Sequence, residues 1–123
     1  MKNITQFYQY LKNTFPQINR CKFWDEYDWS ENGYENSFIM TEIAREINSW
    51  NVKSEYDEFT KLFQIIENGF TEYDNATSSF LTTDFLVTIM EIEDKNTRDE
   101  IKKFMKSKTQ EKYKEMLKFY REK

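Results

Sequence analysis

The chain has 123 residues, a length typical of one domain, and 33% of them are charged. It contains no histidine, which removes the commonest general base and metal ligand, and its single cysteine excludes an internal disulfide or a cysteine metal cluster. With two glycines and one proline, it lacks the residues for a glycine-rich phosphate loop or a turn-rich β-sandwich. Its aromatic content of 18% indicates a folded domain. We therefore expect a single domain over residues 1–123, with no cofactor and no enzymatic activity.

The net charge of −4 is unevenly distributed along the chain. Residues 1–94 contain seven basic and seventeen acidic residues, a net charge of −10. Residues 95–123 contain eleven basic and five acidic residues, a net charge of +6. The sequence thus predicts an acidic body and a basic C-terminal region.

The first predicted helix covers residues 4–15. Five large apolar residues recur there at helical spacing: Ile4, Phe7, Tyr8, Leu11 and Phe15. Asn3 or Thr5 is placed to cap its start, and Pro16 to end it. Residues 17–34 have no clean period, which predicts a short helix near 18–27 followed by a loop through 30–33.

Two amphipathic helices are predicted in the middle of the chain. The first covers residues 36–50, with one apolar face made of Ile39, Met40, Ile43, Ala44, Ile47 and Trp50. The second follows a capping-box pattern from Ser54 to Asp57, and its apolar stripe consists of Tyr56, Phe59, Leu62, Phe63 and Ile66. Gly69 stands where a left-handed residue would end this helix.

The segment from Asn75 to Asp94 contains a β-branched stretch, FLVTIMEI, that alone resembles a strand. Its apolar pattern runs for more than a dozen residues without a breaker, which favours a buried helix: Phe80, Leu81, Phe85, Leu86, Ile89, Met90 and Ile92. Thr97 and Glu100 then form a second capping-box pattern, with Ile101, Phe104 and Met105 on the inner face. Thr109 precedes a last helix, whose apolar stripe is Tyr113, Met116, Leu117 and Tyr120.

These elements predict an all-α fold of about six helices joined by short polar turns. Antiparallel hairpins stacked on one another are the natural arrangement, either HEAT-like or as an irregular bundle. Residues 37–67 and 76–117 fit two helix pairs of a HEAT-like stack, although the sequence contains no strict internal repeat.

Carboxylate pairs and the cysteine are the first candidates for chemistry. Glu42 and Glu46 lie one helical turn apart, and Glu91, Glu93 and Asp94 cluster at a helix end, as a site for a hard cation would require. Di-metal helical bundles add histidines, which this chain lacks, so solvated helix faces are the favoured interpretation. Cys21 has no histidine to activate it and is better explained as a packed thiol.

The basic C-terminal region resembles a nucleic-acid footprint in composition. Glu111, Glu115 and Glu122 interrupt it, and the chain as a whole is acidic, with a pI of about 5.0. We therefore predict no nucleic-acid partner and interpret the region as a lysine-coated final hairpin.

Residues 24–35, WDEYDWSENGYE, interleave aromatic and acidic side chains without any basic residue. In one interpretation, Trp24 and Trp29 anchor the core and the carboxylates simply face water. In the other, the segment is a recognition surface in which carboxylates attract a basic partner and aromatic residues anchor it. The predicted partner-binding residues are Asp25, Glu26, Tyr27, Asp28, Trp29, Glu31, Tyr34 and Glu35.

Four stretches together resemble small helical bacterial proteins: YENSFIMTEIAREINSW, DEFTKLFQIIENGF, TTDFLVTIMEIED and IKKFMKSKTQEKYKEML. Proteins of that kind look HEAT-like and accompany secreted polymorphic toxins as immunity proteins. The similar pieces cover about residues 25–117 and contain no catalytic signature, so the resemblance assigns no functional residue. It implies inhibition of a toxin by binding, in the cytoplasm of the cell that produces the toxin.

The sequence therefore predicts an immunity or inhibitor protein that neutralises a basic toxin, such as a nuclease, through an acidic and aromatic surface. A non-catalytic helical adaptor of a regulatory or phage-related complex is the alternative, and a carboxylate-based metal enzyme is a third. No run approaches the roughly 18 apolar residues of a membrane span. We expect a cytoplasmic monomer or weak dimer with a protein partner and no membrane contact.

Overall fold

The computed structural model describes residues 2–30 and 35–121, and within them the chain is helical with no strand. The elements in chain order are α1 (Ile4–Thr14), α2 (Pro16–Asn19), the 3₁₀ turn η1 (Lys22–Glu26), α3 (Glu35–Asn48), α4 (Tyr56–Thr71), α5 (Asn75–Phe80), the π-helical segment η2 (Leu81–Leu86), α6 (Val87–Met90), α7 (Lys95–Lys102) and α8 (Ser107–Arg121). Because α5, η2 and α6 join without a break, the described residues form six longer helices together with α2 and η1. The all-α prediction is confirmed.

Helix α1 begins where its sequence predicts and ends at Thr14, one residue before the predicted end. Asn3 caps it through a full capping box: the Asn3 side chain accepts from the Gln6 amide at 3.1 Å, and the Gln6 side chain accepts from the Asn3 amide at 2.8 Å. Phe15 leaves the helical conformation, and Pro16 begins α2 at the position where its missing N–H costs nothing. The prediction of Asn3 as a cap is confirmed.

Residues 75–90 form one continuous helix, which confirms the choice of helix over strand. It begins at Asp74, whose side chain accepts from the backbone amide of Thr77 at 2.9 Å and from its hydroxyl at 2.7 Å. It ends at Met90, four residues earlier than predicted, and its middle turns are π-helical from Leu81 to Leu86. Leu81, Phe85 and Leu86 from this wider segment are fully buried.

Two predicted helix starts are wrong. At α4, Asn51 orders the preceding turn by accepting from the amides of Lys53 and Ser54, and Glu55 occupies the cap position without a side-chain cap bond. At α7, Asp94 is the cap, so the helix begins two residues before Thr97. In both places an earlier Asn or Asp closes the turn, because its side chain reaches amides two or three residues ahead.

The predicted end of α4 at Gly69 is also wrong, because the helix continues to Thr71. Gly69 is buried, and a Cβ atom there would lie 2.5 Å from Leu81 Cδ1 and 3.0 Å from Phe7 Cε1. Both of those side chains are themselves fully buried. The glycine therefore allows α4 to approach α1 and η2 closely, and it ends no helix.

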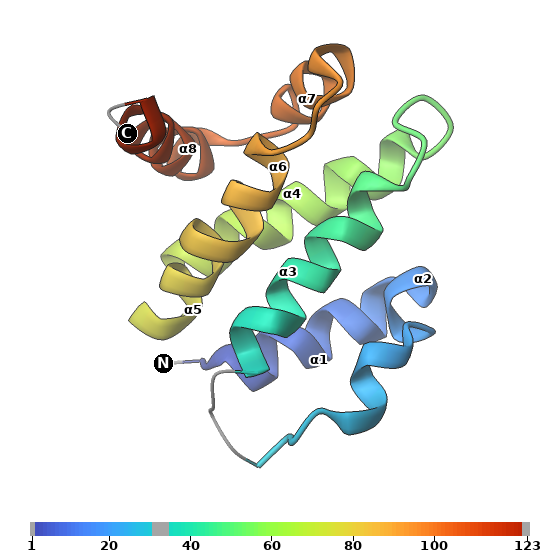
Figure 1. The fold of residues 1–123 in the computed structure, drawn as a ribbon. Helices are drawn as coiled ribbons and strands as arrows, with labels where there is room; N and C mark the ends of the chain where they lie inside the picture. Colours follow the sequence, from blue (N-terminus) through green and yellow to red (C-terminus); the bar gives the residue numbers. More distant parts are fainter. Residues whose placement is uncertain (1, 31–34, 122–123) are drawn as a thin grey trace.

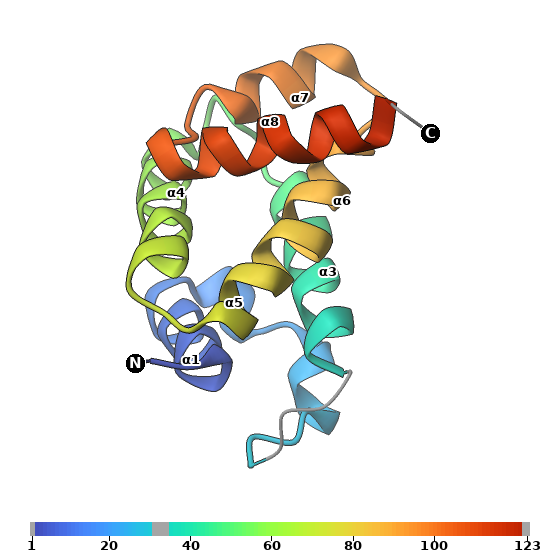
Figure 2. The same ribbon diagram turned by 90° about the vertical axis from the view of Figure 1, so that its left-hand side faces the viewer.

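Helix α3, helix α4 and the 75–90 helix lie between two layers of helices that cross them. Helix α3 and the 75–90 helix run in the same direction, and α4 runs against them (Figures 1 and 2). Helices α1 and α2 cross one end of these three, and α7 and α8 cross the other. Helix α3 packs chiefly against η2 and α6, and α4 packs against α8. The main contacts thus join helices of different predicted pairs, and the HEAT-like arrangement stays a prediction.

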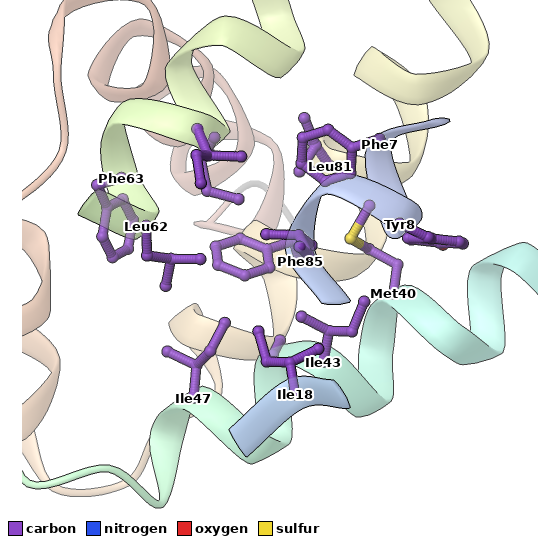
Figure 3. Packing of buried hydrophobic residues seen from close by; sticks show 14 of the residues in the cluster. Phe7, Tyr8, Ile18, Met40, Ile43, Ile47, Leu62, Phe63, Leu81 and Phe85 are labelled. Atoms are coloured by element: carbon purple, nitrogen blue, oxygen red, sulfur yellow. The ribbon is translucent and has the colours of Figure 1, made fainter. Parts of the chain in front are cut away.

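One continuous core fills the space between these helices. Figure 3 shows it built from Phe7 and Tyr8 of α1, Ile18 of α2, Met40, Ile43 and Ile47 of α3, Leu62 and Phe63 of α4, and Leu81 and Phe85 of η2. The apolar stripes predicted for the first four long helices therefore point inward, except that Tyr56 at the start of α4, predicted as part of its stripe, is 62% exposed. Within the described ranges, no helix has the length and apolar content that crossing a bilayer requires.

Helix α8 is held in place by a carboxylate from another helix. Glu67 of α4 accepts from the backbone amides of Lys108 and Thr109, both at 2.9 Å, and from the Thr109 hydroxyl at 2.8 Å. These amides belong to the first turn of α8 and have no partner within that helix. Partial burial tends to raise the pKa of Glu67, but the hydrogen bonds from Thr109 and Lys108 together outweigh it and hold the pKa below its ordinary value.

We expect Glu67→Gln to lower the free energy of unfolding at pH 7 by about 1–2 kcal/mol, because a charged acceptor is lost from a helix N-terminus. The folded-state pKa of Glu67 lies below its ordinary value of 4.5, so this stabilisation is fully present above pH 4.5 and is lost as pH falls through the folded pKa. Urea unfolding between pH 3 and 7 measures both effects. Glu93→Gln, at an exposed loop position, is the matched control and should leave stability unchanged. Equal stability of the two variants at pH 7 would contradict the capping role.

Candidate functional site: an acidic face beside helix α3

The turn η1 is fixed to the core by one tryptophan. Trp24 is 6% exposed, and its indole N–H donates to the backbone carbonyl of Ile18 at 2.8 Å. Its ring lies edge-on to Tyr8 of α1, with 5.4 Å between ring centroids. Asp25 and Glu26, the next two residues, are exposed. Burial of Trp24 therefore sets the position from which both carboxylates project into water.

Asn36, in the first turn of α3, joins three parts of the chain. Its side chain is fully buried, its backbone carbonyl accepts from the Tyr8 hydroxyl at 2.6 Å, and its side-chain oxygen accepts from the Tyr27 hydroxyl at 2.5 Å. Burial, together with the charges of Glu35 and Asp28, raises the pKa of Tyr27 to about 12. Tyr27 is therefore a neutral donor at physiological pH, and it ties the segment after η1 to α3.

Trp29 completes an aromatic cluster on the same side of α1. It stacks on Trp24 with 5.4 Å between centroids and lies edge-on to Tyr27 at 4.7 Å. The ammonium of Lys12 lies 4.9 Å from the centroid of the Trp29 ring and 5.3 Å from that of Trp24. Just beyond, the Asp28 side chain accepts from the amide of Ser30 at 2.9 Å.

The structure divides the predicted binding residues into groups. Asp25, Glu26 and Asp28 are exposed, and Glu35 and Trp29 are half-buried. Tyr27 is only 7% exposed and its hydroxyl is already bonded, so its ring presents little surface, and its role as a partner-binding anchor stays a prediction. Glu31 and Tyr34, with most of the predicted loop, lie outside the described residues. The two interpretations of this segment are thus compatible: its indoles pack inward, and carboxylates face water beside them.

A surface hollow of about 380 Å³ lies between η1 and the start of α3. It is lined by Lys22, Phe23, Asp25, Glu26, Tyr27, Glu35, Phe38 and Ile39. Phe38 is 57% exposed, although it sits in a helix whose other large apolar residues point inward. We call Asp25, Glu26, Glu35 and Phe38 the acidic face.

Sequence reasoning missed Phe38, although a signal for it was present. Phe38 precedes Ile39 and therefore lies about 100° away from the apolar stripe of α3. Glu35 lies three residues before Phe38 and Glu42 lies four residues after it, so all three are on the same side of the helix. An aromatic residue among carboxylates on the outer side of an amphipathic helix predicts an exposed ring.

A second hollow of about 660 Å³ adjoins the first, with Lys22 and Phe23 lining both. Both of its carboxylates have partners. Glu42 pairs with Arg45 at 2.8 Å, and the Glu46 carboxylate accepts from the Trp50 indole at 2.9 Å. The predicted Glu42 and Glu46 pair therefore has structural partners. No group of three or more metal-ligating side chains is placed to hold an ion in the described part of the chain.

Cys21 lines the second hollow, and its thiol donates toward Gln17 and Glu46. Burial, followed by the charge and hydrogen bonding of Glu46, raises the pKa of the thiol to about 11. A nucleophilic cysteine needs the opposite shift, because the thiolate is the reactive form.

We expect Tyr27→Phe to cost about 1–3 kcal/mol of unfolding free energy, since it leaves the buried side-chain oxygen of Asn36 without its donor. Tyr56→Phe is the matched control, because Tyr56 is 62% exposed. Chemical denaturation compares the two. A Tyr27→Phe chain as stable as Tyr56→Phe would show that the Asn36 contact does not order this segment.

The Cys21 thiol should react slowly with iodoacetamide in the folded protein. A pKa near 11 instead of 9.0 leaves roughly one-hundredth of the thiolate at pH 8, so alkylation should be about a hundredfold slower than in denaturant at the same pH. Glu46→Gln removes a nearby charge and should speed the folded-state reaction. Equal rates in the folded and unfolded chains would contradict the raised pKa.

Comparison with known families gives a match over most of the chain. A family described as a domain of unknown function (DUF7674) matches residues 8–121. No match was found among curated proteins or among solved structures. The matched region includes the acidic face and all of the helices from α3 to α8. The chain therefore belongs to the DUF7674 family.

Proposed function

We propose that this protein acts without catalysis, by binding a basic protein through the acidic face. The observation that carries the proposal is Phe38, which is 57% exposed beside a hollow lined by Asp25, Glu26 and Glu35. Lys22 is the only basic residue that lines this hollow among the residues the structure describes. An apolar ring surrounded by acidic groups suits a partner surface where a cleft or aliphatic patch is flanked by lysine or arginine.

The two kinds of side chain contribute differently to such a complex. Exposed carboxylates accelerate encounter with a basic surface, an effect that weakens as salt rises. The Phe38 ring contributes by removal of apolar surface from water, which depends little on salt. Affinity at physiological salt should therefore depend on Phe38, and association rate on the carboxylates.

The acidic face rests on an ordered base, which favours tight binding. Trp24 and Tyr27 are buried and hydrogen-bonded, so the backbone of η1 and of the first turn of α3 is fixed before a partner arrives. A surface that is ordered in advance loses less conformational entropy on association.

In its most specific form, the proposal is that the partner is a toxin and that the protein is its immunity factor. The support is the net charge of −10 on residues 1–94, together with the resemblance of residues 25–117 to immunity-type helical proteins. Nuclease toxins are basic because they hold nucleic acid. An acidic protein that covers their active surface would block access to it.

The test begins with affinity capture from lysate of the source organism, using wild-type protein and an Asp25→Lys/Glu26→Lys/Phe38→Ala variant. We expect the wild type to retain a basic protein and the variant to lose at least about tenfold in affinity for it. The captured protein is then expressed in a bacterial host with and without this chain. Growth arrest that wild-type protein relieves, and the triple variant does not, is the result expected of an immunity factor.

A matched variant separates local recognition from total charge. Glu91→Lys/Glu93→Lys/Tyr10→Ala makes the same change in charge and removes another exposed ring, outside the acidic face. It should bind like wild type. A captured protein that binds all three forms equally would remove the acidic face from the mechanism, and a captured protein without effect on growth would remove the toxin.

A further inference from the structure

A third hollow, with a different character, lies between α7 and α8. Its volume is about 480 Å³, and it is lined by Asp99, Lys102, Lys103, Met105, Gln110, Tyr113, Lys114 and Leu117. Helices α7 and α8 form the layer at one end of the molecule, and η1 lies at the other end (Figure 2). The hollow is therefore remote from the acidic face.

The floor of this hollow is apolar and its edge is basic. Met105 and Tyr113 are 4% and 3% exposed, and Leu117 is half-buried beside them. The Lys102 ammonium lies 5.1 Å from the centroid of the Tyr113 ring, which holds this charge over the floor. The exposed Lys114 comes one residue after Tyr113 and forms no ion pair with any residue the structure describes.

Two other lysines of α8, outside the lining of the hollow, are paired with carboxylates of the same helix. Lys108 pairs with Glu111 at 3.5 Å, and Lys112 pairs with Glu115 at 3.9 Å. Asp99 lines the hollow, but its carboxylate lies 3.8 Å from the ammonium of Lys95, which is not a lining residue. Lys103, which also lines the hollow, pairs with Glu100 at 2.9 Å. Lys102 and Lys114 are the lining lysines for which the described residues supply no ion pair.

We propose that the α7–α8 hollow binds an acidic, amphipathic segment of a second protein partner. Apolar side chains of the segment would contact Met105, Tyr113 and Leu117, and its carboxylates would pair with Lys102 and Lys114. Charge complementarity selects this occupant, since an apolar floor with basic residues at its edge matches an apolar stripe flanked by Asp or Glu. The chain would then have two binding ends of opposite charge, and the second goes beyond the acidic face.

Nucleic acid fits the same hollow less well. Base stacking needs an open aromatic face, and Tyr113 is buried with Lys102 above its ring. A phosphate backbone needs an extended basic track, whereas Glu111 and Glu115 interrupt the lysines of α8.

The test uses two fluorescein-labelled helical peptides with leucines at i, i+3, i+4 and i+7. One carries glutamate at all other positions and the other carries lysine. Fluorescence anisotropy with the full chain should show that the glutamate peptide binds at least about tenfold more tightly than a scrambled glutamate peptide. Amide chemical-shift changes on binding should map to α7 and α8.

Three variants locate the interaction. Lys102→Glu/Lys114→Glu and Leu117→Asp should each weaken binding of the glutamate peptide at least about tenfold. Lys61→Glu/Lys53→Glu makes the same charge change at exposed positions outside the hollow and should bind like wild type. Circular dichroism of each variant shows whether the fold is retained. Should Leu117→Asp unfold the chain, the double lysine variant and the shift map still decide.

Other outcomes overturn the proposal. These are binding that survives Lys102→Glu/Lys114→Glu, shift changes at α3 instead of α8, or tighter binding of a labelled single-stranded RNA than of the glutamate peptide. Sedimentation that shows self-association through the same lysines would make a second copy of this chain the occupant. The lysine peptide tests the proposed function separately. It should bind to the acidic face of the wild-type chain, and this binding should be lost in the Asp25→Lys/Glu26→Lys/Phe38→Ala variant.

Discussion

The hydrogen bonds of Asn36 are the constraint on which the candidate site depends. Asn36 is fully buried, and burial of a polar side chain is costly unless its atoms are bonded. The Tyr27 hydroxyl donates to its side-chain oxygen and the Tyr8 hydroxyl donates to its backbone carbonyl, whereas its side-chain nitrogen has no hydrogen-bond partner among the described residues. Tyr8 fixes the start of α3 against α1, and Tyr27 fixes the segment after η1 against α3. These two bonds, together with the burial of Trp24, set the relative positions of Asp25, Glu26, Glu35 and Phe38.

This arrangement explains how one short segment holds so many aromatic and acidic residues. The indoles and the Tyr27 phenol point toward α1, where they form edge-on and stacked contacts with one another and with Tyr8. The carboxylates occupy the intervening positions and point outward. Burial of the rings fixes the backbone, and the fixed backbone places the negative charges. Buried aromatic side chains and exposed carboxylates are therefore interleaved along the same segment.

The opposite end of the molecule is held together by a charged side chain. Glu67 of α4 binds the first-turn amides of α8, so a carboxylate on one helix substitutes for a local cap on another. That contact fixes the crossing layer of α7 and α8 over the three long helices, and with it the basic hollow. The basic residues 95–123 thus lie largely in the layer of α7 and α8, at the end of the molecule remote from η1 and its exposed Asp25 and Glu26 (Figure 2).

Helix content and inward faces were determined by the sequence itself, because they depend on local periodicity. The stripes of α1, α3 and α4, the cap at Asn3 and the break at Pro16 each involve residues a few positions apart. The helical state of residues 75–90 also followed from length and pattern. Long-range contacts are not encoded in this local way, which is why the capping of α8 by Glu67 and the π-helical turn at Leu81–Leu86 were not predicted.

The candidate site shows the same division. The density of aromatic and acidic residues in 24–35 is evident from composition alone. The exposed carboxylates of Asp25 and Glu26 agree with the expectation that acidic side chains of this segment face water. Whether Tyr27 points inward depends on Asn36 and Tyr8, which only folding brings to it. Gly69 was assigned to a helix end on local grounds, whereas Phe7 and Leu81 from other helices require its missing side chain. Local spacing decided which residues form helices, and packing between distant segments decided which side chains remain available to a partner.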